Sequence, residues 1–135
     1  TLTIGSLIYI CFRSDKLLMF NWFDKLMLTD MIAKIREFTM PHKIKLPSWF
    51  LYSLPDGLWI FSYVYLMISI WGRTININNL FWFSLIPSIA IFSEIGQLIK
   101  VVPGTFDFVD LSLYVIGFFL PFVFTINYKL KNSTI

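Results

Sequence analysis

The stretch LFWFSLIPSIAIFSEIGQLI, residues 80–99, decides the fold class, because it is apolar over the length of a membrane-spanning helix and carries a single charged residue. An α-helix rises about 1.5 Å per residue, so about 20 residues cross the ~30 Å hydrocarbon core of a bilayer. Stretches 49–71 and 109–128 have a similar length and character. The sequence therefore predicts an all-α polytopic membrane helix bundle, with three to four transmembrane helices in one domain that covers 1–135.

The composition leads to the same class of protein. The 135 residues are 57% hydrophobic, 19% aromatic and 14% charged, and the mean hydropathy is +0.72. A soluble domain is nearer half apolar and a quarter charged, so the excess of apolar groups would have no interior to occupy. A single cysteine excludes a disulfide-stapled scaffold, and the sequence contains no nucleotide-loop, metalloprotease, thiol-redox or serine-hydrolase motif. We expect no cofactor and no nucleic-acid partner, and the sequence leaves open whether the protein is an enzyme.

The first third of the chain differs from the rest. Residues 2–12 are apolar, but a helix of that length spans only about 17 Å, which predicts a partial or short transmembrane helix over 1–12. Residues 14–40 alternate charged and bulky apolar side chains, and the apolar ones recur every three or four positions. That spacing predicts one amphipathic helix in the membrane interface, which contacts membrane lipids and could also dock a protein partner.

The distribution of Lys and Arg predicts the sidedness of the bundle. Seven of the 11 basic residues lie between residues 13 and 45, and Lys100 falls on the same side if the short first helix crosses. Three remain for the opposite side: Arg73, Lys129 and Lys131. By the positive-inside rule, the amphipathic segment and the loop at Lys100 are predicted to face the cytoplasm.

Polar residues within the apolar part of the chain are the candidate binding site. They are Asp56 near the start of the first span, Glu94 and Gln97 near the end of the second, and Asp107 and Asp110 at the start of the third. Short loops between antiparallel helices place all five on one side of the bilayer. Glu94 lies about 21 Å along its helix from Leu80, inside the hydrocarbon, where a carboxylate is costly unless it is paired, hydrated or protonated. We therefore expect an acidic pocket under the turn formed by Pro103 and Gly104.

Structural roles compete with binding at each of these positions. Asp107 has the placement of an N-cap, Asp110 could complement the helix dipole, and Asp56 could cap a helix that begins after Pro55. Glu94 and Gln97 could form a hydrogen-bonded packing pair. No His or Cys lies beside the acids in the sequence, so we predict no zinc site and no other metal site. Two stripes of residues share helix faces and are expected to face each other: Pro87, Ala90, Glu94 and Gln97, and Asp110, Tyr114, Gly117 and Pro121.

The second half of the chain contains these residues in a distinctive order: Glu94-Ile-Gly-Gln97, then Pro103-Gly104-Thr105-Phe106-Asp107-Phe108-Val109-Asp110, then Gly117. Over roughly residues 46–122 this order resembles the signature of VanZ-like membrane proteins, and Asp56 matches an earlier Asp of that family. Thr105 stands where the family has Arg, and Ile60 where it has His. The resemblance implies a multi-pass protein of the bacterial cytoplasmic membrane, and it implies this setting more directly than a reaction.

Three functions are compatible with these features. The first is binding or acting on an envelope amphiphile, a lipid or a lipid-linked glycan, through the acidic pocket. The second is a non-catalytic structural or accessory subunit of a membrane complex, in which the same polar residues hold helices together. The third is a proton or cation pathway, which ranks last because the sequence offers no continuous polar route across the bundle.

Overall fold

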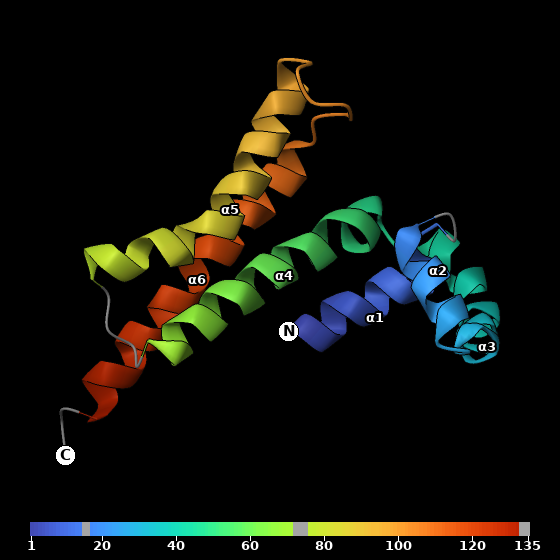
Figure 1. Cartoon of the computed structure of the whole chain (residues 1–135), viewed down its shortest axis with the longest axis horizontal. Coiled ribbons are helices and arrows are strands. Elements are labelled where there is room, and N and C mark those ends of the chain that lie inside the picture. The colour runs from blue at the N-terminus through green and yellow to red at the C-terminus, as the bar shows by residue number, and fades with distance from the viewer. Residues whose placement is uncertain (15–16, 72–75, 133–135) are drawn as a thin grey trace.

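Six α-helices and one 3-10 helix make up the part of the chain that the computed structural model describes, residues 1–14, 17–71 and 76–132, with side chains as far as Thr125 (Figure 1). The elements in chain order are α1 (Leu2–Phe12), α2 (Leu18–Lys25), α3 (Thr29–Thr39), η1 (Met40–Lys45), α4 (Ser48–Ile70), α5 (Ile77–Leu98) and α6 (Phe108–Asn132). Among the basic residues that predict sidedness, Lys16 and Arg73 lie outside the described residues, as do the side chains of Lys129 and Lys131.

Three of these helices are long and apolar enough to cross a membrane. They are α4, α5 and the part Phe108–Thr125 of α6, and their bounds lie within a few residues of the three helices predicted from hydropathy. Many of their large hydrophobic side chains face outward, among them Leu66, Phe92 and Phe119. An apolar exterior over helices of this length is what contact with lipid requires. The all-α membrane fold is therefore the one that the sequence predicts.

Helix α1 is an apolar helix of 11 residues that packs against α4 in the opposite direction. At its start the hydroxyl groups of Thr1 and Ser62 lie 2.7 Å apart, and just beyond its end Arg13 contacts Tyr52. Between them, Gly5 lies against the indole of Trp59. This antiparallel packing brings the end of α1 to the N-terminal half of α4.

Helix α4 continues through Pro55, although the sequence suggested an interruption at residues 55–57. A proline removes one backbone hydrogen bond from a helix interior, and membrane helices tolerate that loss when neighbouring elements pack around it. Pro55 is fully buried in this way. Because the helix begins at Ser48, Asp56 lies about 12 Å inside it, and the capping role considered for Asp56 is wrong.

The single amphipathic helix expected over 14–40 is wrong, because this segment forms two helices followed by η1. The chain turns at Met27, whose φ is 57°, in the left-handed region that ends a helix. After the turn, the Thr29 hydroxyl donates a short hydrogen bond to the Asp24 carboxylate. Asp30 in the first turn of α3 complements the dipole of the new helix. The segment predicted to lie at the membrane interface is therefore a helical hairpin of α2 and α3.

Basic side chains attach this hairpin to the end of α1. Arg36 Nη1 donates to the Ile10 carbonyl at 2.7 Å, and Lys43 Nζ donates to the Phe12 carbonyl at 3.0 Å. The last carbonyl groups of a helix have no partner within the helix, so cations there are favourable for hydrogen bonding and for the helix dipole. As a result, α2 and α3 lie beyond the N-terminal end of α4 (Figure 1).

Helices α4 and α6 approach each other closely at two glycines. A Cβ atom added to Gly117 would lie 2.6 Å from the backbone oxygen of Gly57, and one added to Gly57 would lie 3.0 Å from Leu113 Cβ. Small residues permit such contacts between membrane helices. On α6, the stripe residue Gly117 lies against α4, whereas Tyr114 of the same stripe and Ala90 of the α5 stripe both pack against the buried core.

Candidate functional site

Three of the predicted acidic residues come together at one end of the bundle. Asp56 from α4, Glu94 from α5 and Asp110 from α6 interact electrostatically, and Tyr114 of α6 interacts with all three. We call Asp56, Glu94 and Asp110 the acid cluster. These acids meet because the chain reverses direction from α5 to α6, which places the end of one helix beside the start of the next (Figure 1).

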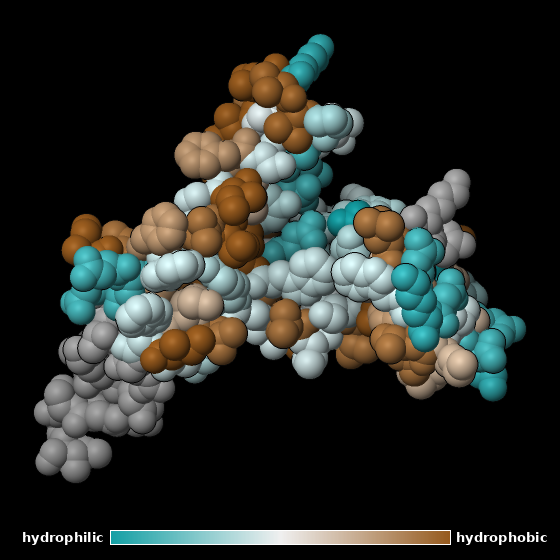
Figure 2. All heavy atoms as spheres, in the orientation of Figure 1, coloured by the Kyte–Doolittle hydropathy of each residue, from teal (hydrophilic) through white to brown (hydrophobic). Residues whose placement is uncertain are grey.

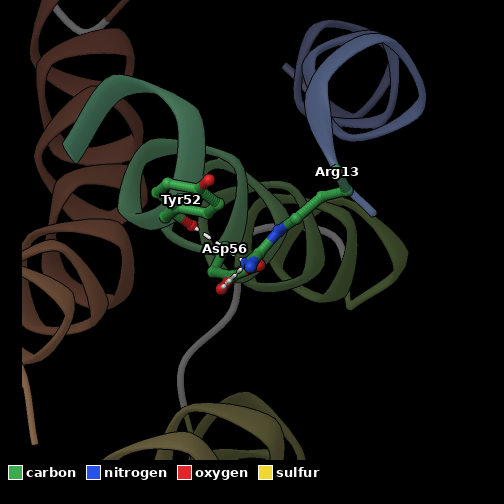
Figure 3. Close-up of polar contacts among 3 residues, drawn as sticks. All are labelled: Arg13, Tyr52 and Asp56. Atoms are coloured by element: carbon green, nitrogen blue, oxygen red, sulfur yellow. Dashed lines mark hydrogen bonds and ion pairs between the residues drawn. The ribbon is translucent and has the colours of Figure 1, made fainter. Parts of the chain in front are cut away.

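Arg13 supplies a positive charge to this cluster from the end of α1. Its Nη2 lies 3.5 Å from Asp56 Oδ2, and the two side chains are each 26% exposed. The same nitrogen donates to the Tyr52 carbonyl at 3.3 Å, while the guanidinium lies 5.0 Å from the ring centroids of both Tyr9 and Tyr52 (Figure 3). Arg13 is therefore held by charge, by a hydrogen bond and by two aromatic rings.

The role of Arg13 is absent from the sequence analysis, which used this residue only to predict sidedness. One feature of the sequence could have indicated an ion pair: Arg13 is the first charged residue after an apolar stretch, and no counter-ion was assigned to it. The basic residue beside the acids thus comes from the end of α1.

Glu94 joins the end of α5 to the start of α6. Its side chain is buried, and Oε1 accepts a hydrogen bond from the Asp107 backbone N–H at 2.6 Å. Asp107 in turn accepts the backbone N–H of Val109 at 2.8 Å, which confirms the N-cap interpretation of Asp107. The hydrogen bond of Glu94 thus goes to the turn, and the structure records no pairing of Glu94 with Gln97.

Gln97 supports the turn between α5 and α6. Gly104 has a φ of 141°, and a Cβ atom added there would lie 2.7 Å from Gln97 Cδ. Both the backbone conformation and the close contact require glycine at this position. Pro103 and Gly104 are exposed in this turn. Gln97 lies beneath them, as expected, and its side chain contacts Gly104.

Three polar atoms at or near the acid cluster are buried and have no hydrogen-bond partner within the described residues: Asp110 Oδ1, Arg13 Nε and Ser53 Oγ. Ser53 is 1% exposed. Gly57 contacts Leu113, and Ser53 and Asp110 each lie about one turn before that contact on α4 and α6. They are therefore at the same level of the α4–α6 interface. Ser53 was missed as a site residue, although its spacing of four from Gly57 places both on one helix face.

Two cavities of the protein lie elsewhere. One of about 470 Å³ lies between α2 and α3 and is open to the outside, and one of about 360 Å³ lies between α4 and α6 with an apolar lining that includes Gly57 and Gly117. None of the acid cluster lines either cavity. A ligand-binding pocket at Asp56, Glu94 and Asp110 thus stays a prediction from the sequence.

Comparison with family models, curated proteins and solved structures finds no match for this chain. The chemistry of the site must therefore be argued from its own groups. The carboxylates can accept hydrogen bonds from hydroxyl and amine groups, and the tyrosine and serine hydroxyl groups can both accept and donate. Arg13 adds hydrogen-bond donors at one edge. The arrangement is suited to binding a polar group at the end of a membrane bundle.

Proposed function

We propose that this chain is a multi-pass protein of the VanZ type in the bacterial cytoplasmic membrane, and that its acid cluster binds the hydroxyl-rich head of a membrane amphiphile such as a lipid-linked glycan. The observation that carries the proposal is the buried, unbonded Oδ1 of Asp110 beside two further carboxylates. A buried polar atom without a partner is costly, and such residues within membrane helices are functional candidates by default.

The balance of charge favours this class of ligand. Three carboxylates face one guanidinium, so the site carries excess negative charge and an excess of hydrogen-bond acceptors. A hydroxyl-rich head donates several hydrogen bonds without adding negative charge, whereas an anionic phosphate alone would be repelled. Bonds of this kind are stronger at the end of a membrane bundle than in bulk water, because the local dielectric constant is lower.

The proposed membrane and orientation depend on the sequence signature and on the basic residues of 13–45. The α2–α3 hairpin, the N-terminal half of α4 and the α5–α6 turn belong to one end of the bundle. If the positive-inside rule applies, that end faces the cytoplasm and the acid cluster binds its ligand from there.

The test is binding of a glucosyl-diacylglycerol to the purified full chain in detergent, measured by native mass spectrometry. Replacing Asp110 with Asn keeps the size of the side chain and removes its charge, so we expect glycolipid affinity to fall about tenfold, as for loss of one charge-assisted hydrogen bond. Asp30→Asn is the matched control, because Asp30 is an exposed acid on α3, and it should bind as the native protein does. Unchanged affinity in Asp110→Asn would contradict the proposal.

The accessory-subunit alternative is favoured by a different observation. Glu94 is already bonded to the Asp107 backbone, and Asp56 is already paired with Arg13, so both have structural roles. Under that alternative, Glu94→Gln and Asp110→Asn lower the amount of inserted protein and of assembled complex together. Under the binding proposal both variants insert at normal abundance and lose glycolipid binding. Quantitative blotting of membrane fractions beside the binding assay distinguishes the two.

A further inference from the structure

The larger cavity lies in the interfacial hairpin, away from the acid cluster. It has a volume of about 470 Å³, in the range of small-molecule binding sites. Residues on one face of α2 and the facing side of α3, together with Met40 at the start of η1, form its lining. These residues are Phe20, Phe23, Asp24, Thr29, Ile32, Ala33, Arg36, Glu37 and Met40.

Charged and aromatic groups of this cavity form a definite pattern. Phe20 and Phe23 meet edge to face with ring centroids 5.9 Å apart, and Arg36 Cζ lies 4.9 Å from the centre of the Phe20 ring. Arg36 is fixed by its hydrogen bond to the end of α1 and keeps further N–H groups for other partners. Glu37 is exposed and forms no hydrogen bond or ion pair within the described residues. With Asp24 and Glu37 against Arg36, the lining has a net negative charge.

The outer surface of the hairpin is typical of a segment at the level of lipid headgroups. Trp22 is 63% exposed, Met27 93% and Phe38 77%, while basic residues flank them. Figure 2 shows hydrophobic and hydrophilic residues interleaved over this part of the molecule. Exposed aromatic and apolar side chains mixed with charges are what an interfacial helix presents to a bilayer. At that level of the membrane, phospholipid headgroups are the molecules nearest to the hairpin.

We propose that this cavity binds the headgroup of a phospholipid that carries an ammonium group. The ammonium contacts the carboxylates of Glu37 and Asp24 and the faces of the phenylalanine rings, which attract cations through their quadrupoles. Arg36 receives the phosphate, and the apolar floor at Ile32 receives the first carbons of the lipid. A zwitterionic head matches both signs of charge in the lining, whereas an anionic head without an amine leaves two carboxylates unpaired. This site is independent of the one proposed at the acid cluster.

The test compares two lipids with identical acyl chains, phosphatidylethanolamine and phosphatidylglycerol, titrated into the full chain in detergent and followed by native mass spectrometry. We expect the ammonium lipid to bind about tenfold more tightly, as for one gained charge-assisted contact. Glu37→Gln should remove most of this difference, and the exposed-acid control Asp30→Asn should retain it. Free phosphoethanolamine should compete if the headgroup alone is recognised, and competition by spermidine of equal strength would show that the amine alone is bound and overturn the lipid proposal.

Two other results would also overturn the proposal: equal affinity for the two lipids, or an unchanged preference in Glu37→Gln. A protein that copurifies in stoichiometric amount with the hairpin and blocks lipid binding would show that a protein partner occupies the cavity. Asp110→Asn should leave the preference for the ammonium lipid intact. This last variant separates failure at the hairpin from failure of the glycolipid proposal.

Discussion

Gly117→Ala is expected to lower the stability of the bundle by about 1–3 kcal/mol, the usual cost of forcing extra volume into a packed interface. The added Cβ atom would lie 2.6 Å from the backbone oxygen of Gly57. A backbone carbonyl within a buried helix cannot rotate away, so α4 and α6 must move apart. The measurement is the midpoint of thermal unfolding in detergent, followed by size-exclusion chromatography of heated samples.

Gly96→Ala provides a matched control for this prediction. A Cβ atom at Gly96 would also lie 2.6 Å from its nearest neighbour, but that neighbour is a methyl group of Val102 in the α5–α6 turn. Both variants gain the same helix propensity, about 0.5–1 kcal/mol, so the comparison isolates what the new atom meets. We expect Gly96→Ala to cost clearly less. Equal losses in the two variants would mean that α4 and α6 do not cross at Gly117.

Arg13→Met is the second variant for which we expect a large effect. The change keeps an apolar stem between the Tyr9 and Tyr52 rings and leaves Asp56 without its counter-ion. Breaking a fully buried pair costs about 3–5 kcal/mol, and this pair is partly exposed, so we expect a loss of about 1–2 kcal/mol. The same thermal assay measures it.

A second substitution tests whether the loss comes from the unpaired acid. In Arg13→Met with Asp56→Asn the charge at residue 56 is gone, and we expect most of the lost stability to return. Lys43→Met is the control, because Lys43 is another cation at the end of α1, where it donates to the Phe12 carbonyl, and it has no recorded ion pair with Asp56. Asp56→Asn should not rescue that variant. If the double variant at 13 and 56 is only as stable as Arg13→Met, the ion pair does not contribute as described.

The spanning helices could be predicted from sequence because hydropathy adds up over about 20 residues and does not depend on neighbours. The break in the interfacial segment could not. Phe23, Met27 and Met31 are spaced by four, as in one continuous helix, yet Met27 adopts a left-handed conformation in the turn. The periodicity of side chains continues across a change in backbone direction, and the hydrogen bond from Thr29 to Asp24 bridges this turn.

The part of the candidate site that could be predicted is the part that follows from the direction of the helices. Asp56, Glu94 and Asp110 lie in the halves of α4, α5 and α6 that alternating chain direction places at the same end of the bundle, so their meeting follows from topology. Arg13 joins them through the packing of α1 on α4, a contact between residues 43 positions apart that no local pattern encodes. Ser53 was missed for the same reason, since its burial comes from the packing of α4 against the rest of the chain.

The most direct test of the account concerns the claim that α4, α5 and α6 bring the acid cluster to one face of the membrane. In a Cys11→Ser background, single cysteines replace the exposed residues Ser48, Asn78 and Thr105, and an impermeant thiol reagent is applied to right-side-out and inverted vesicles. Labelling after detergent solubilisation shows that each cysteine is reactive. We predict that positions 48 and 105 react from one face and position 78 from the other. Reaction of positions 78 and 105 from the same face, or of 48 and 105 from opposite faces, would contradict the account.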